Sequence, residues 1–261
     1  MLNRSEIKRI AKLTGLKPYQ QEKHYIQTLI LRSIYSQYSP VFKGGTALMF
    51  IIGLNRFSED LDFTISEEIN LRKMPNKIKS DLELFGITSR TKIINETQAS
   101  FSFRISAEGP LFTKQIDQSF VRVEISHRGD LVLKPKTIFI NPEYPDQLPF
   151  SVLIMAYSEI LAEKFRAVIT RNKARDLYDI WFLIKQNINT TINIINKKLE
   201  YYNVKFDIDQ LLEAISAKKD QWSAELTPIV IGELPVFEEV KQKIFEAIKK
   251  LQRKNDEHKP F

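Results

Sequence analysis

Two aspartates, Asp60 and Asp62, stand two positions apart and alternate with apolar residues. This alternation predicts a strand over Asp60–Ile65 that places both carboxylates on one face. Neighbouring carboxylates on one face repel each other unless a cation lies between them. Mg²⁺ takes oxygen ligands and commonly bridges protein carboxylates to the phosphates of a substrate. The pair therefore indicates a site for Mg²⁺ or Mn²⁺.

A glycine turn upstream of the aspartates supplies the second part of the predicted site. The backbone N–H groups of Gly44 and Gly45 can hold phosphate oxygens. The hydroxyls of Thr46 and Ser58 are candidates for phosphate contacts, and Thr46 is also a candidate cap of the helix that follows the turn. Lys43 either reaches the phosphates or faces solvent. Together with the aspartates, these residues indicate a site for a metal–nucleoside triphosphate (NTP).

A third carboxylate is expected if the site binds two metal ions, because acidic residues commonly supply the ligands of such a pair. Glu124 is the candidate, since it lies in the predicted strand Phe120–His127 and shares a face with Arg122 and Ser126. The alternative is a surface glutamate that pairs with Arg122.

Composition limits the possible classes of protein. The 261 residues include 39 basic and 32 acidic side chains, a formal charge of +7, and no cysteine. Disulfides and thiolate metal sites are therefore excluded. The sequence contains no apolar run of transmembrane length and no signal peptide, so we expect a cytoplasmic protein with no membrane partner. The basic excess suits a polyanion such as RNA, although it is equally compatible with a solvated surface. Part of the excess lies near the C-terminus, at Lys249, Lys250, Arg253, Lys254 and Lys259.

Hydrophobic periodicity predicts helices first, then mostly strands, then helices again. Two helices are expected within residues 5–38, a short buried helix over 46–53, and a charged surface helix over 67–85. The predicted strands after the aspartate strand are Ile87–Asn95, Phe101–Ser106, Phe120–His127 and Lys136–Ile140.

The proline-spaced segment 141–149 ends the β-rich part, and helices are expected over 149–170 and 176–185. This order predicts an α+β fold. We expect N-terminal helices over 1–38 packed on a core over 39–145, followed by a helical domain over 146–261.

A second group of charged residues lies in the predicted helical part. Lys164 and Arg171 lie near one helix face, and Asp176 and Asp179 are three positions apart and so face the same way. By pattern alone this is a helix–loop–helix with ordinary salt bridges. The histidines His24, His127 and His258 are scattered, and the sequence has no Walker A loop.

The segments KGGTAL (43–48), RFSEDLDF (56–63), AEKFRA (162–167) and RNKARDLYDI (171–180) occur in an order that resembles the AbiEii/AbiGii toxins, which include the MenT-type toxins. These belong to the DNA polymerase β superfamily of nucleotidyltransferases. The resemblance implies a polymerase β-like core with a mixed sheet flanked by helices. It also implies that Lys164 contacts triphosphate oxygens and that Asp176 is an essential acidic residue near the nucleotide or the acceptor. Arg175 and Asp179 are expected to hold the loop, and Arg56 to neutralise the acidic pair.

The implied reaction moves a nucleoside monophosphate from an NTP to an acceptor and releases pyrophosphate. For some family members the acceptor is the tRNA 3′ end, and the family role is that of a toxin in a type IV toxin–antitoxin or abortive-infection system. An antitoxin is therefore an expected partner. Two other functions stay open: transfer to a small molecule, and nucleotide binding without turnover.

Overall fold

The computed structural model describes residues 1–65 and 69–257, and the chain divides into two compact units. Unit 1 comprises residues 1–53, 57–131 and 135–154. Unit 2 comprises residues 54–56 and 132–134 together with the chain from residue 155 onward. The first residues of the helix predicted over 67–85, and also His258 and Lys259, lie outside the described residues.

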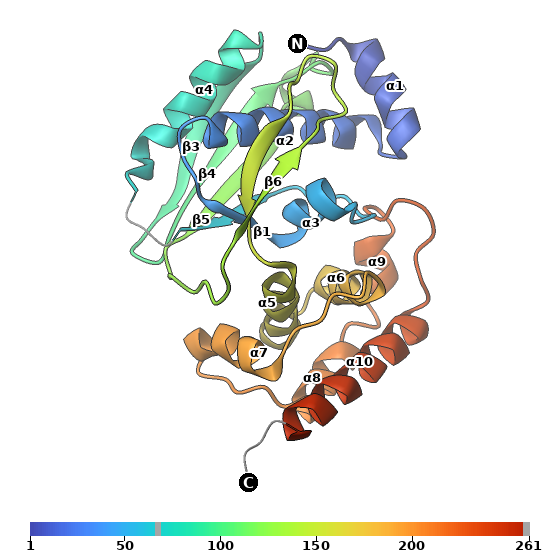
Figure 1. Cartoon of the computed structure of the whole chain (residues 1–261). Coiled ribbons are helices and arrows are strands. Elements are labelled where there is room, and N and C mark those ends of the chain that lie inside the picture. Colours follow the sequence, from blue (N-terminus) through green and yellow to red (C-terminus); the bar gives the residue numbers. More distant parts are fainter. Residues whose placement is uncertain (66–68, 258–261) are drawn as a thin grey trace. The chain divides into compact units, whose positions relative to one another are not determined.

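Unit 1 is built on a seven-stranded mixed sheet with the strand order β3-β4-β5-β2-β1-β7-β6 (Figure 1). The pairs β2/β5 and β1/β7 are parallel, and the other neighbours are antiparallel. The strands are β1 (Val41–Lys43), β2 (Leu61–Thr64), β3 (Thr88–Glu96), β4 (Ser100–Glu108), β5 (Ser119–Ser126), β6 (Lys136–Ile140) and β7 (Phe150–Ile154).

The helices of unit 1 are α1 (Arg4–Thr14), α2 (Pro18–Tyr35), α3 (Gly44–Ile52) and α4 (Met74–Leu84). Helix α2 packs on β5 and β7, and α4 packs on α2, β3 and β4. In β5, Val121, Val123 and Ile125 are buried, whereas Arg122 and Glu124 on the opposite face are about half exposed. The apolar face of β5 thus contributes to the core of unit 1, and the face that carries Glu124 remains partly open.

Helix α3 begins two residues before the predicted start at residue 46. Lys43 is its N-cap residue, Gly44 and Gly45 are its first residues, and no side chain of the N-cap closes its end. Thr46 lies inside the helix, so the expectation that it caps α3 is wrong. The glycine turn is thus the N-terminus of a helix, with its N–H groups unsatisfied by the helix itself.

Strands β1 and β7 were not expected from the sequence. Residues 150–154 lie in the segment predicted to be helical, yet they pair in parallel with β1 and antiparallel with β6. A short apolar run fits a strand or a helix equally well, so partners distant in the sequence decide its structure. Only residues 157–170 of the predicted segment are helical.

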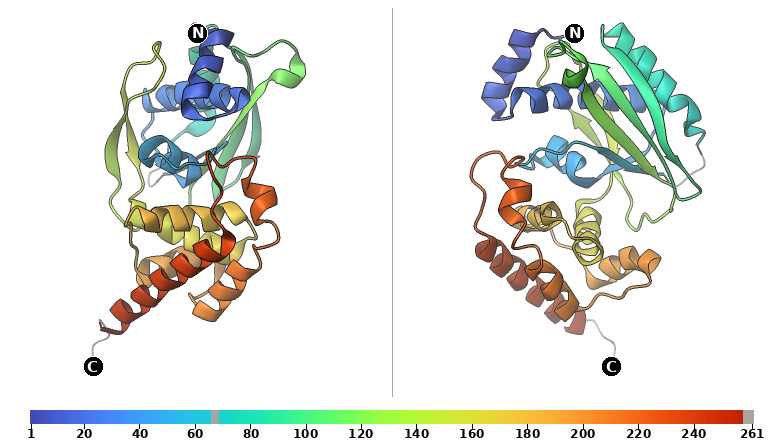
Figure 2. Two further views of the ribbon diagram at one scale, coloured as in Figure 1. Left: turned by 90° about the vertical axis from the view of Figure 1, so that its right-hand side faces the viewer. Right: turned by 180° about the vertical axis from the view of Figure 1, so that it is seen from behind.

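Unit 2 is helical among the described residues, as Figure 2 shows from two further sides. Helix α5 packs on α6, α7 and α8, and α10 contacts the same three helices. A mixed sheet flanked by helices, followed by helices alone, confirms the predicted α+β fold class. Among the helices in the described ranges, none is both long and apolar enough to cross a lipid bilayer. The helices are α5 (Tyr157–Thr170), α6 (Ala174–Lys185), α7 (Ile192–Leu199), α8 (Ile208–Ser216), α9 (Trp222–Leu226) and α10 (Phe237–Glu257).

Candidate active site

The sheet of unit 1 brings predicted site residues together in one row. Lys43 pairs with Asp62 between β1 and β2, Asp62 with Glu124 between β2 and β5, and Glu124 with Ser102 between β5 and β4. Residues paired in register point to the same face, and neighbouring strands lie about 4.8 Å apart. Lys43, Asp62 and Glu124 are therefore immediate neighbours on one face. Asp60 directly precedes β2.

Gly44 lies against the carboxylate of Asp62. A Cβ atom added to Gly44 would be 2.6 Å from Asp62 Oδ2, and the φ angle of Gly44 is +77°. Both observations require glycine, because other residues rarely adopt this φ and because the carboxylate occupies the space of a side chain. The first turn of α3 and the acidic strand are thus in direct contact, as a phosphate-binding turn beside a metal site would require.

Hydrogen bonds hold the loop between α3 and β2. Thr46 is fully buried; its hydroxyl donates to the carbonyl oxygen of Asp60 and lies within hydrogen-bond distance of Ser58 Oγ, at 2.9 Å. The buried Gln27 of α2 donates its Nε2 to the carbonyls of Ser58 and Glu59, at 3.0 and 2.7 Å. Thr46 therefore fixes the position of Ser58 and Asp60. The sequence analysis missed Gln27, because a glutamine in an amphipathic helix carries no signal of its partner.

The carboxylates on this face could supply some of the oxygen ligands that a hard divalent cation needs. Asp60 and Asp62 offer only oxygen donors, and Mg²⁺ is commonly bound by one or two carboxylates together with substrate phosphates. In the described part of the chain, no three His, Cys, Asp or Glu side chains gather closely enough to hold a metal ion. Glu124 pairs with Arg122, with Nη2 and Oε2 3.0 Å apart. Its role as a third ligand stays a prediction.

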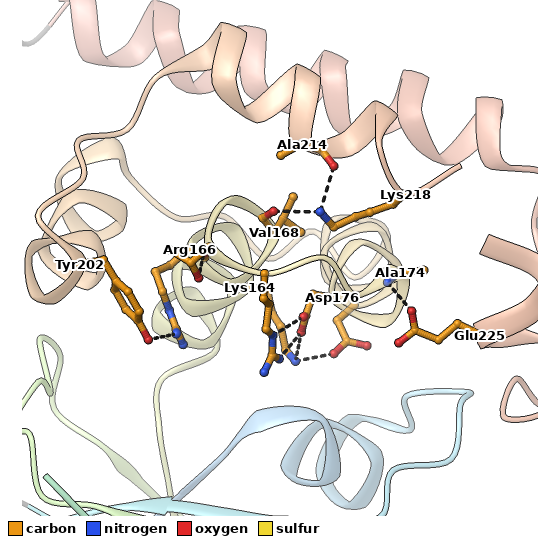
Figure 3. Close-up of polar contacts among 12 residues, drawn as sticks. Lys164, Arg166, Val168, Ala174, Asp176, Tyr202, Ala214, Lys218 and Glu225 are labelled. Carbon is orange, nitrogen blue, oxygen red and sulfur yellow. Dashed lines mark hydrogen bonds and ion pairs between the residues drawn. The ribbon is translucent and has the colours of Figure 1, made fainter. Parts of the chain in front are cut away.

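The charged residues of the second predicted group meet inside unit 2. Lys164 of α5 and Asp176 of α6 point toward each other, with Nζ 3.1 Å from Asp176 Oδ1 (Figure 3). Lys164 Nζ is also 2.7 Å from Asp179 Oδ2, and both aspartates are fully buried. These are buried ion pairs rather than the ordinary salt bridges of a solvated helix–loop–helix.

Arg171 completes this cluster from the loop between α5 and α6. Its Nε and Nη2 donate to the two carboxylate oxygens of Asp176 at 2.7 and 2.8 Å, and its side chain remains half exposed. Burial alone would raise the pKa of Asp176, but Lys164 and Arg171 together hold that pKa well below its ordinary value. Asp176 is therefore an ionised carboxylate that fixes two cationic side chains.

Arg56 belongs to the same buried cluster. Its Nε and Nη2 bind Asp179 Oδ1 and Oδ2 at 2.6 and 2.7 Å. Burial opposes the charge of Arg56, yet the carboxylate of Asp179 raises the pKa of the guanidinium above its ordinary value. We expected Arg56 to neutralise Asp60 and Asp62. The structure instead shows that Arg56 forms a bidentate ion pair with Asp179. Asp179 thus binds both Arg56 and Lys164, and its expected role in holding the loop stays a prediction.

A second buried ionic cluster in unit 2 was not found from the sequence. Lys198 of α7 is 2.6 Å from Glu159 Oε1 and 3.3 Å from Glu163 Oε1. The Glu159 carboxylate also accepts the backbone N–H groups of Val132 and Leu133, at 2.9 and 2.8 Å. These contacts tie the segment 132–134 to the helices. No local pattern links residues so far apart in the chain.

Comparison with known proteins identifies a family and similar folds. The family model described as nucleotidyl transferase AbiEii toxin, type IV TA system, matches residues 30–248. A search of the curated proteins found no match. Among solved structures, the fold is similar to JHP933 from Helicobacter pylori (21% identity, TM-score 0.60, covering 91% of this chain and 95% of that one). It is also similar to MenT4, a nucleotidyltransferase toxin from Mycobacterium tuberculosis (16% identity, TM-score 0.65, covering 97% of this chain and 90% of that one).

Proposed function

The chain belongs to the AbiEii family of nucleotidyl transferase toxins, and we propose that it transfers a nucleoside monophosphate from an NTP to RNA, at the tRNA 3′ end. The reaction requires Mg²⁺ or Mn²⁺ and releases pyrophosphate. The observation that carries the proposal is the row of Lys43, Asp62 and Glu124 beside the glycine N-terminus of α3. Carboxylates and a phosphate-binding helix end are what a metal–triphosphate substrate needs.

In this proposal each residue of unit 1 has a defined task. Asp60 and Asp62 hold the cation, which when bound would stabilise charge on the reacting phosphate. The N–H groups of Gly44 and Gly45 bind phosphate oxygens, and Lys43 adds a positive charge beside them. Ser58 donates to the triphosphate, while Thr46 holds Ser58 in place through its hydroxyl.

In unit 2, the proposal assigns contact with the triphosphate to Lys164, as the family resemblance implies. Asp176 orients Lys164 and Arg171 through the ion pairs described above. Its low pKa keeps it ionised at neutral pH, which suits a positioning carboxylate better than a proton acceptor.

The proposed biological role is that of a toxin acting in the cytoplasm, where NTPs and tRNA are available. The type IV toxin–antitoxin description of the family supports a cognate antitoxin as a partner. Modification of tRNA 3′ ends would block aminoacylation and so explain toxicity.

The direct test is an incubation of the protein with each α-labelled NTP, Mg²⁺ and total RNA, with pyrophosphate measured in parallel. We expect label in the tRNA fraction and an equal amount of pyrophosphate. Asp62→Asn should abolish both, whereas Glu59→Gln should not, because Glu59 is exposed and pairs with Lys23. Label on a small-molecule acceptor alone would favour nucleotidyl transfer to a small molecule over transfer to RNA. Binding of NTP without pyrophosphate release would favour a non-catalytic module.

A further inference from the structure

A groove of about 720 Å³ lies on unit 2 between the end of α6, the residues that follow it, and α10. Its volume lies within the range of ligand sites. Ile184, Ala247 and Leu251 contribute apolar surface to it. Among its described lining residues, one is acidic, Glu246, and four are basic: Lys185, Lys243, Lys250 and Arg253. The groove is therefore strongly cationic, and two of these residues belong to the basic stretch near the C-terminus.

The groove also contains a buried polar group that lacks a partner. Thr190 is 6% exposed, and its Oγ1 makes no hydrogen bond to any residue that the structure describes. Burial of an unsatisfied hydroxyl is costly, so such an atom needs an explanation. Asn187 and Asn189 line the groove beside it. Hydroxyl and amide groups beside lysines are suited to bind phosphate and ribose oxygens.

The spacing of the cations favours an extended anion over a single phosphate. Lys243 and Lys250 lie seven positions apart on α10, which corresponds to about 10 Å along the helix axis. Successive phosphates of a nucleic-acid strand can each contact one of these ammonium groups without drawing the two lysine side chains together.

We propose that this groove binds the sugar–phosphate backbone of the RNA acceptor. The inference rests on the proposed function for the identity of the polyanion. An acidic protein segment would also match the charge, but its carboxylates only accept hydrogen bonds, whereas ribose hydroxyls can both donate to and accept from Thr190, Asn187 and Asn189. Because the described lining contains no aromatic ring on which bases could stack, binding should tolerate changes in RNA sequence.

The test compares two double variants of the full-length protein. Lys243→Gln with Lys250→Gln removes two charges from the groove. Lys241→Gln with Lys249→Gln removes the same charge from the same helix, but Lys241 binds Ser216 Oγ and Lys249 lies over the ring of Phe245, and neither lines the groove. The probe is a tRNA transcript, and its dissociation constant is measured without NTP over a range of salt concentrations.

We expect the groove variant to bind tRNA roughly tenfold more weakly at low salt. The slope of the logarithm of affinity against the logarithm of salt concentration should be shallower by about 1.4, because each lost phosphate contact removes about 0.7 from that slope. The control should stay within about twofold of the unmodified protein. Equal weakening in both variants would overturn the groove assignment, as would an unmodified protein that binds no tRNA. Binding of polyglutamate as tight as binding of tRNA would overturn the choice of RNA.

Thr190→Val gives an independent readout. Loss of the hydroxyl should weaken tRNA binding several-fold while leaving the thermal stability of the free protein equal or higher, because the hydroxyl has no partner there. Unchanged tRNA affinity would count against the groove. A different result would overturn the proposed function alone: the unmodified protein binds tRNA through this groove but transfers no nucleotide to it.

Discussion

Gly44 and Asp62 are in such close contact that the carboxylate occupies the space of a side chain on Gly44. A Cβ atom there would be 2.6 Å from Oδ2 and 3.2 Å from Cβ of Asp62. The glycine therefore does more than permit a turn. It allows the N-terminus of α3 and the acidic strand β2 to approach each other, so that a helix end suited to phosphate lies beside a carboxylate suited to a metal.

Gly44→Ala should abolish most nucleotidyl transfer, because the new methyl group must displace Asp62. Gly53→Ala is a matched control, since Gly53 also has a positive φ, of +67°, but nothing lies within 4 Å of its added Cβ. Both variants should lose about 1 kcal/mol of stability from the backbone conformation. Activity and urea unfolding measured side by side would separate the two effects. Equal activity of the two variants would contradict the assigned role of Gly44.

Thr46→Val should reduce the affinity for NTP by about tenfold and lower stability by about 1–3 kcal/mol, since the buried hydroxyl that holds Ser58 and Asp60 is lost. Thr28→Val is the control. Thr28 is equally buried, but its hydroxyl donates to the backbone of its own helix at His24. KM for NTP and the free energy of unfolding provide the comparison. A KM change of the same size in Thr28→Val would indicate a general packing effect.

Lys164→Ala should lower the free energy of unfolding by about 3–5 kcal/mol, because it leaves two buried carboxylates without one of their cations. An ordinary salt bridge on a solvated helix, which the sequence pattern alone indicated, would contribute at most about 1 kcal/mol. The ion pairs to Asp176 and Asp179 change the expectation for stability. Lys173→Ala is the control, since Lys173 is exposed and should change stability by less than about 0.5 kcal/mol. Chemical denaturation of both variants decides the matter, and full stability of Lys164→Ala would refute this interpretation.

His24 should make stability depend on pH between about 6.5 and 4. Its half-buried ring stacks on Phe50, its Nδ1 lies 2.7 Å from the Tyr144 hydroxyl, and desolvation lowers its pKa to about 4. The unfolded chain therefore binds a proton in this range that the folded chain does not. The contribution of neutral His24, at most about 3 kcal/mol, is fully present above pH 6.5 and is lost as the pH falls toward 4. Urea unfolding across this range, together with NMR titration of the ring, measures it. An NMR pKa near 6.5 would contradict the prediction.

The sequence predicted most of the strands of unit 1, because alternating residues such as those of β5 are buried on one face and exposed on the other. It did not predict β1 or β7. Strand β1 has three residues, too few to show a period, and β7 is defined by its pairing with β1 and β6. Short apolar runs take the structure that their distant neighbours impose.

In the candidate site too, the sequence predicted which residues take part but not the contacts between residues that are far apart in the chain. The spacing of Asp60 and Asp62 was sufficient to propose a metal-binding face, and the alternation in β5 was sufficient to propose Glu124. The direct register of Glu124 with Asp62 depends on a parallel pair of strands far apart in the chain. The partner of Arg56 was assigned by proximity in sequence, whereas the structure places the guanidinium on Asp179, 123 residues away.

Glu124→Gln tests whether this residue is the third metal ligand. Asp62 and Glu124 are neighbours in register, so a cation held by Asp62 lies within reach of both carboxylates, although Glu124 pairs with Arg122 in this structure. We expect Glu124→Gln to raise the Mg²⁺ concentration for half-maximal activity by about tenfold or more, because a carboxylate ligand is lost. Arg122→Gln removes the competing partner of Glu124 and should leave this concentration equal or lower. Activity titrated with Mg²⁺ and with Mn²⁺ provides the measurement. Parallel effects of the two substitutions would mean that the pair with Arg122 is the whole role of Glu124, and that Asp60 and Asp62 bind the cation without it.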